Sequence, residues 1–206
     1  MNPISRAIAV LTAPGPTTTT AAGEPATTQG LIVGYAAPLS ALPSLAMLVF
    51  TLIRVGGLLG SIIVNLILTF IATWLLRDLG VAIVIGLLLA AIAPNFGGRK
   101  DSVNAIKLAV LAGTPIWIAA LIMALLVLLV PTLGGLAYII LLLGFAYGGY
   151  ILYLGAGPML GVPKEQAPIV AGIGIIAWLV LYFIAEQIIA RVLMGSMGGG
   201  SVIVVG

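Results

Sequence analysis

Long apolar runs dominate the chain from Leu31 onward, and each run can be tested for whether it crosses a bilayer. A transmembrane helix needs about 20 consecutive apolar residues to cross the hydrocarbon layer. Prolines inside such a run are tolerated, because neighbouring helices satisfy the freed carbonyls. Four runs meet the length: Leu31–Ile53, Ala109–Val130, Leu136–Ala156 and Ile169–Ile189. The pattern therefore predicts four membrane-spanning helices at these positions.

The stretch from Val55 to Ala93 can be divided in two ways, because the charged pair Arg77-Asp78 interrupts it. In the first interpretation a helix spans from about Leu75 to Ala93, and Val55–Thr73 is an interfacial or re-entrant segment. In the second both pieces cross and the pair marks a tight turn, although Leu79–Ala93 would rise only about 22 Å. The chain is thus predicted to be an all-α membrane protein, a polytopic bundle of five transmembrane helices with six possible.

The first 30 residues differ in composition and pattern from the rest of the chain. Residues 1–11 alternate polar and apolar groups at helical spacing, which favours a helix lying on the membrane surface over a cleaved signal peptide. Residues 12–30 are rich in Thr, Pro and Gly, which indicates a tether or a strap lying on the bundle. The chain thus divides into residues 1–30, a bundle over 31–193 and a Gly-rich tail over 194–206.

The composition fits a membrane protein and offers little chemistry. Apolar residues make up 62% of the chain and charged residues only 6%, against about 25% charged in soluble domains. Without Cys or His, the chain lacks thiol and imidazole chemistry, and no pair of carboxylates shares a predictable helix face. Its few cations form no stripe. We therefore expect no enzyme activity, no metal, no cofactor and no nucleic-acid partner, and the sequence identifies no soluble substrate.

Charge also predicts the orientation. The loops Asn95–Lys107 and Gly157–Gln166 are separated by two spans, so they share one face, and they carry four cations. The positive-inside rule places both loops in the cytoplasm of a bacterial inner (plasma) membrane protein with multiple spans. The charges leave the N-terminus on either face, according to whether five or six helices cross.

The sequence PNFGGRKD, Pro94–Asp101, is the clearest candidate interaction site. A Gly-Gly turn beside cations could bind a phosphate or a lipid headgroup. The favoured interpretation is a turn in which Gly97 and Gly98 end one helix and Asp101 or Ser102 caps the next. It is not a P-loop, because the GKS or GKT sequence is missing. The candidate loop residues are Pro94, Phe96, Gly97, Gly98, Arg99, Lys100, Asp101 and Lys107.

Two further features lie inside predicted spans. Glycines and tyrosines at short spacing indicate a helix-packing face, made by Gly144, Tyr147, Gly148, Tyr150 and Tyr153.

An acid within a span is a functional candidate by default, which singles out Glu186 together with Arg77 and Asp78. The favoured interpretation is that Glu186 reaches the headgroups or pairs with Arg191.

The chain resembles a bacterial member of the Yip1 family over most of its length. The resemblance is carried by Glu24–Thr28, Leu31, Gly34-Tyr35, Ala41–Ala46, Ala93–Asp101, Ala105, Lys107, Thr114-Pro115, Trp117, Tyr147–Gly155 and Pro163–Ala167. It implies a five-span bundle with a cytoplasmic N-terminus. Eukaryotic relatives are membrane-trafficking proteins that associate with small GTPases.

Two functions are expected from these features. The preferred one is a non-enzymatic scaffold or accessory subunit that binds membrane lipids, other integral membrane proteins or itself. The alternative is a small transporter or lipid-handling protein that uses Glu186, Arg77-Asp78 or the PNFGGRKD loop.

Overall fold

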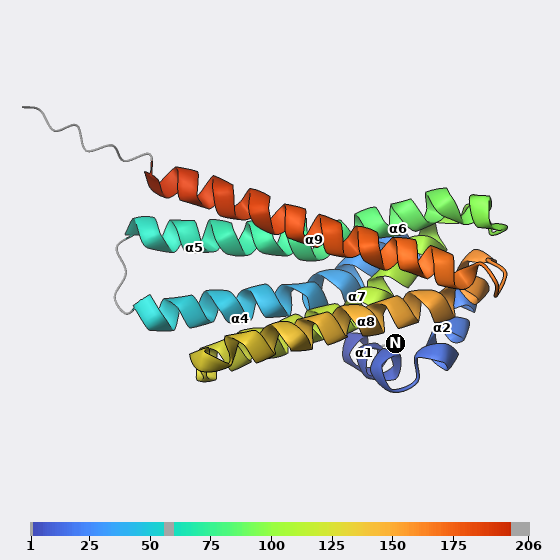
Figure 1. Ribbon diagram of the computed structural model, residues 1–206, viewed down its shortest axis with the longest axis horizontal. Helices are drawn as coiled ribbons and strands as arrows, with labels where there is room; N and C mark the ends of the chain where they lie inside the picture. Colours follow the sequence, from blue (N-terminus) through green and yellow to red (C-terminus); the bar gives the residue numbers. More distant parts are fainter. Residues whose placement is uncertain (1, 56–59, 199–206) are drawn as a thin grey trace, which may run out of the picture.

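The computed structural model describes residues 2–55 and 60–198, and these residues form helices and no strand. Five helices are long and apolar enough to cross a membrane, so the predicted five-span bundle is confirmed. Figure 1 shows them lying alongside one another, with loops at the ends. They cover Thr28–Ile53, Ile63–Phe96, Ser102–Leu129, Gly134–Leu160 and Ala167–Val192. Each of the four predicted runs lies within or nearly within one of these spans.

The second span is one continuous helix, so both interpretations of the stretch from Val55 to Ala93 are wrong. Arg77 and Asp78 lie inside this helix rather than at a turn or at the headgroups, because each finds a partner there. The helix consists of α5 (Gly60–Ala72), the π-helix η2 (Thr73–Gly80), α6 (Val81–Ile92) and the 3₁₀ turn η3 (Ala93–Phe96).

The π-helical turn η2 depends on a glycine. A Cβ added to Gly80 would lie 2.7 Å from the carbonyl oxygen of Leu75, five residues earlier. The wide turn therefore has room only for glycine at this position. Such turns inside α-helices are rare and occur frequently at functional sites.

Helix α7 (Ser102–Leu129) is the centre of the bundle. It packs against α4 (Ala37–Val55), α6 and α8 (Gly134–Leu160), and every residue from Ala105 to Trp117 is buried. The 3₁₀ turn η4 (Pro131–Leu133) joins α7 to α8. Neighbours surround the first part of α7, and the last part exposes Ile122, Leu125 and Leu129. The helix is therefore apolar on all sides rather than along one stripe.

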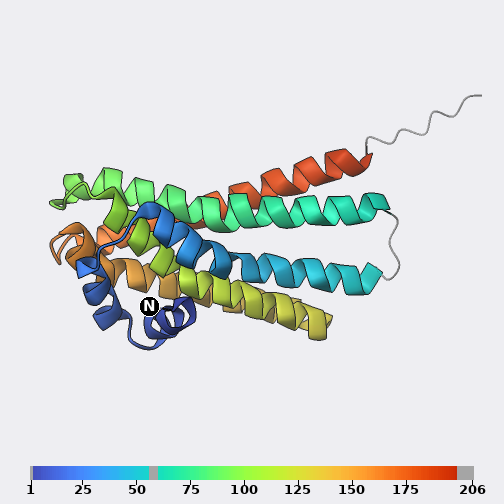
Figure 2. The same cartoon turned by 180° about the vertical axis from the view of Figure 1, so that it is seen from behind.

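Helix α9 (Ala167–Gly198) packs against α8, α6 and η2. Figures 1 and 2 both show α9 running beside α5. Part of the predicted Gly-rich tail is helical, since α9 continues to Gly198, and residues 199–206 lie outside the described part of the chain.

The N-terminal segment is helical and packed. It forms α1 (Pro3–Thr12) and α2 (Pro14–Gly23), and the chain then enters α4 through α3 (Thr28–Leu31) and the π-helix η1 (Ile32–Ala36).

Composition did not predict the helix in the Thr/Pro-rich part. Pro14 stands in the first turn of α2, where its missing N–H costs nothing. The hydroxyls of Thr17 and Thr18 donate to carbonyls of the preceding turn. Helix α2 contacts α7 and α8, and Ala21 is fully buried. We call residues 3–27 the strap, which Figure 2 shows lying on the bundle.

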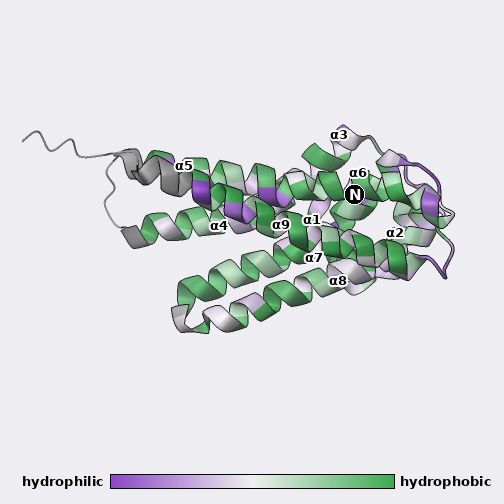
Figure 3. Ribbon diagram, turned by 45° about the horizontal axis from the view of Figure 1, so that its top comes forward, coloured by the Kyte–Doolittle hydropathy of each residue, from purple (hydrophilic) through white to green (hydrophobic). Residues whose placement is uncertain are grey.

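Hydrophilic residues are concentrated in two parts of the bundle. Figure 3 shows hydrophilic residues gathered at the end that carries the loops, and a second group on the side where α5 and α9 lie. The first group matches a membrane–water interface, whereas the second lies on helices that are otherwise apolar.

Candidate functional site

An ion cluster joins three spans near the middle of the bundle. The Arg77 guanidinium donates from Nε to Asp78 Oδ1 at 2.9 Å and from Nη1 to Glu186 Oε2 at 2.9 Å. Ser44 of α4 donates to Asp78 Oδ2 at 2.7 Å. Arg77 lies roughly 20 Å or more along the helix from either end of its span. The cluster therefore links α4, η2 and α9 at the depth where an unpaired charge is most costly.

The surroundings of the cluster are aromatic and hydroxylic. Arg77 Cζ lies 4.9 Å from the centre of the Tyr182 ring, a cation–π distance. Trp74, also on η2, donates from Nε1 to Ser40 Oγ and to the Ala37 carbonyl, each at 3.1 Å. A small cavity of about 170 Å³ beside the cluster is bordered by Thr51, Thr69 and Thr73. The cluster thus offers a polar environment within the spans.

The predicted pairing of Glu186 with Arg191 is wrong, because Glu186 pairs with Arg77 instead. Arg191 is exposed, one turn beyond on α9. Asp78, expected at an interface, is 2% exposed. One feature of the sequence could have indicated this arrangement. Arg77 and Glu186 lie on different spans, carry opposite charges and each need a partner when buried.

The PNFGGRKD loop is a capped turn. Gly97 has φ +75°, a left-handed conformation that ends η3, and the Gly98 amide donates to the Ala93 carbonyl. Asp101 caps α7, accepting a hydrogen bond from the Asn104 amide at 3.0 Å. The favoured turn-and-cap interpretation of this sequence is therefore confirmed.

The two predicted loops meet at one end of the bundle. The Arg99 amide donates to the Leu160 carbonyl at 2.8 Å, so the prediction that they share a face is confirmed. Pro94, Arg99 and Lys100 are exposed, and Phe96 is half-buried against the core. Their role as an interaction or lipid-headgroup loop stays a prediction.

Lys107 does not belong to this loop. It lies in α7, five residues after the helix begins, and it is 2% exposed. The strap covers it: Lys107 Nζ donates to the carbonyls of Ala21 and Glu24, each at 2.8 Å. Sequence reasoning placed Lys107 in a solvated loop because the helical strap that buries it was not predicted.

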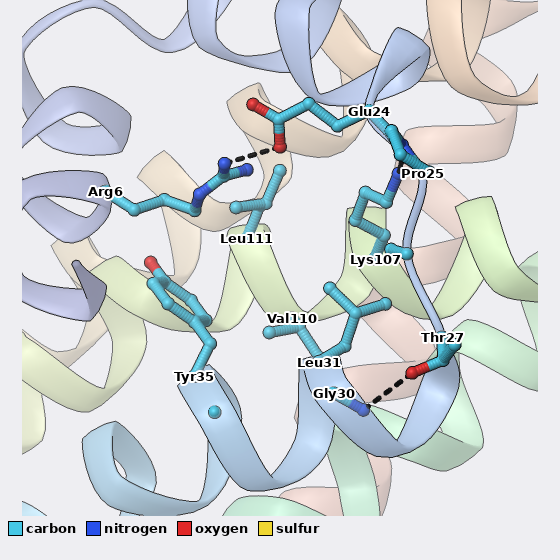
Figure 4. Close-up of a pocket in the computed structure, with 12 residues that line it drawn as sticks. Arg6, Glu24, Pro25, Thr27, Gly30, Leu31, Tyr35, Lys107, Val110 and Leu111 are labelled. Carbon is cyan, nitrogen blue, oxygen red and sulfur yellow. Dashed lines mark hydrogen bonds and ion pairs between the residues drawn. The ribbon is translucent and has the colours of Figure 1, made fainter. Parts of the chain in front are cut away.

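A pocket of about 560 Å³ lies between the strap, η1 and α7. Figure 4 shows Lys107, Arg6 and Glu24 around it, with Leu31 and Val110 beside Lys107. Arg6 forms an ion pair with Glu24. The pocket therefore combines charged and apolar lining residues.

The predicted helix-packing face of α8 is divided. A Cβ on Gly144 would lie 2.6 Å from the Ala119 Cβ, and one on Gly148 would lie 2.8 Å from the Ala112 carbonyl oxygen. These glycines allow α7 and α8 to pack closely. Tyr147 donates to the Leu11 carbonyl of α1 at 2.8 Å. The remaining two, Tyr150 and Tyr153, point outward and are 48% and 42% exposed.

A comparison with protein families decides the identity. The model of the Yip1 domain matches residues 8–198, nearly the whole chain. The chain belongs to the Yip1 family. A search of curated proteins and a search of solved structures each give no significant match.

As a Yip1 protein, the chain is a multi-pass membrane protein whose match includes most of the strap as well as the five spans. The ion cluster lies within the matched residues, and so do the lining residues of the strap pocket apart from Arg6.

Proposed function

We propose that this Yip1 protein is a non-catalytic scaffold or accessory subunit of the bacterial inner membrane, which binds another membrane helix at its α8/α9 surface. The observation that supports this most is a shallow groove of about 440 Å³ between these helices. Its lining residues are Gly149, Tyr153, Pro168, Ala171, Gly172 and Ile175.

The groove suits a transmembrane helix as its occupant. Small residues allow helix backbones to approach closely in membranes, where van der Waals packing drives association. A Cβ on Gly172 would meet nothing within 4 Å. Gly144 and Gly148, by contrast, are already used in packing α7 on α8. Gly172 and the exposed Tyr153 are thus available to a partner helix or to a second copy of the chain.

The expected orientation puts the loop end in the cytoplasm. The exposed cations Arg99, Lys100 and Lys164 support this by the positive-inside rule. Because Pro168 and Gly172 lie in the first two turns of α9, the groove then lies toward the cytoplasmic side. Partners would include integral membrane proteins whose helices reach this half of the bilayer.

Cysteine cross-linking tests the proposal directly, since the chain has no native cysteine. A Gly172→Cys variant in native membranes should give one discrete cross-linked species with a second copy or a defined membrane protein. Ile139→Cys, on an exposed part of α8 away from the groove, is the matched control and should remain largely monomeric. Adding Gly149→Leu should abolish the Gly172→Cys product by filling the groove. Identical patterns for the two cysteines would refute the proposal.

A second candidate, a small transporter or lipid-handling protein, is favoured by the hydroxyl-lined cavity beside Arg77 and Glu186. Polar groups within spans often line substrate paths. If Glu186→Gln and Lys100→Ala both leave flux and lipid binding unchanged in reconstituted vesicles, this candidate is eliminated.

A further inference from the structure

We propose that the pocket beneath the strap binds the phosphate of an anionic phospholipid, with an acyl chain along its apolar wall. The site is separate from the α8/α9 groove, and the inference does not depend on that groove. Its volume of about 560 Å³ lies in the range of small-molecule sites, about 300–1,000 Å³.

Lys107 supplies the first argument. Its ammonium has three N–H donors, and two of them are used by the carbonyls of Ala21 and Glu24. Within the described residues, no acceptor takes the third. The nearest carboxylate on the pocket, that of Glu24, is ion-paired with Arg6. A charge buried this deeply is costly unless a counter-charge accompanies it.

The charges of the pocket supply the second argument. Arg6 and Lys107 are cations and Glu24 is the one acid among the lining residues, which leaves one positive charge in excess. A phosphodiester headgroup such as that of phosphatidylglycerol brings one negative charge and two acceptor oxygens. Guanidinium and ammonium groups are the side chains that bind phosphate in proteins. An anionic phosphate therefore neutralises the excess and accepts from the third N–H of Lys107.

The apolar wall indicates a lipid rather than free phosphate. Leu31, Val110 and Leu111 line the pocket next to the charged groups. Gly34 also borders the pocket, and a Cβ there would meet nothing within 4 Å. Lys107 lies roughly 8 Å along α7 from its first residue. At that depth a phosphate sits beside the charges while the chain continues along the leucines.

The test measures lipid binding to the full chain in detergent by native mass spectrometry. The probes are phosphatidylglycerol, the zwitterionic phosphatidylcholine and soluble glycerol 3-phosphate. Phosphatidylglycerol is expected to bind at least tenfold more tightly than phosphatidylcholine. Gly34→Leu should weaken it at least tenfold, because the new side chain extends into the pocket from a position where a Cβ meets nothing within 4 Å. Val33→Leu, on the same turn but 66% exposed, should change it less than twofold.

A second variant examines the charge. Lys107→Met should remove the preference for phosphatidylglycerol over phosphatidylcholine, and if it does not fold, Gly34→Leu decides alone. Equal affinity for the two lipids in the unmodified chain, or unchanged binding in Gly34→Leu, would overturn the proposal. Glycerol 3-phosphate binding as tightly as phosphatidylglycerol, with the same loss in Gly34→Leu, would retain the phosphate site and overturn the lipid as its source.

Discussion

The ion cluster and the strap pocket both bury cations, but they satisfy them differently. In the cluster, Arg77 meets two carboxylates, and Asp78 also accepts from Ser44. In the pocket, Lys107 has only backbone carbonyls as hydrogen-bond acceptors. Carboxylates of the protein pair with Arg77 and hold helices together, whereas Lys107 has no carboxylate from the described part of the chain bonded to it and can take an anionic ligand. This contrast favours a structural role for the cluster and is the basis on which the pocket is proposed as the lipid site.

The depth of each site in the membrane explains why the two cations are satisfied differently. The cluster lies in the middle of a 34-residue span, far from any headgroup, so the protein itself must supply each counter-charge. Lys107 lies near the start of α7, within reach of the interface, where lipids can supply the anion. Arg77 therefore needs an acid from the protein itself, whereas Lys107 does not.

Removing the central cation of the cluster should have the largest effect. Arg77→Met leaves Asp78 buried without its counter-charge, and breaking a buried pair in this way costs about 3–5 kcal/mol. Lys107→Met should cost less, about 1–3 kcal/mol, because it leaves only neutral carbonyls unpaired. Unfolding of the purified protein in detergent measures both. Arg191→Met, at an exposed site on α9, is the control and should change stability by less than about 0.5 kcal/mol. Equal losses for Arg77 and Lys107 would contradict the contrast between the sites.

The π-helical turn that presents Arg77 and Asp78 should be sensitive to a single methyl group. Gly80→Ala places a Cβ 2.7 Å from the Leu75 carbonyl oxygen, so the turn must shift, at a cost of about 1–3 kcal/mol. Gly172→Ala is a matched control in an open helical position, and there alanine should stabilise the protein by about 0.5–1 kcal/mol. The same unfolding measurement compares them. A Gly80→Ala variant as stable as the unmodified chain would show that the cluster does not need the π turn.

The sequence predicts most of the fold, because the length and hydropathy of each span are local properties. It predicts the turn at Gly97 and the cap at Asp101 for the same reason. The division of the second span was wrong, because a charged pair such as Arg77-Asp78 normally lies at the membrane–water interface. Only its distant partners explain why it lies inside the helix. Glu186 lies 109 positions from Arg77, and no local pattern links the two.

The helices of the strap also depend on distant contacts that the local sequence does not reveal. Threonine and proline are poor helix formers, and the helix of α2 persists because tertiary packing buries Ala21 and Thr18. Packing that depends on the bundle cannot be read from the segment alone. Lys107 was misplaced for this reason, and with it the pocket that its ammonium borders.

The smallest expected effect on stability comes from Glu186, and it compares the two acids of the ion cluster. Glu186→Gln removes one charge but keeps an amide oxygen in place of Oε2, which can still accept from Arg77. The Glu186 side chain is 48% exposed, whereas that of Asp78 is 1% exposed. Arg77 also remains paired with Asp78 in this variant, so the loss should be only about 0.6 kcal/mol, typical of a polar contact between membrane helices. Asp78→Asn, which removes the buried charge, should lower stability several times more in the same assay. A loss of more than about 2 kcal/mol in Glu186→Gln would show that both acids are essential and that α9 is held to η2 chiefly by charge rather than by packing.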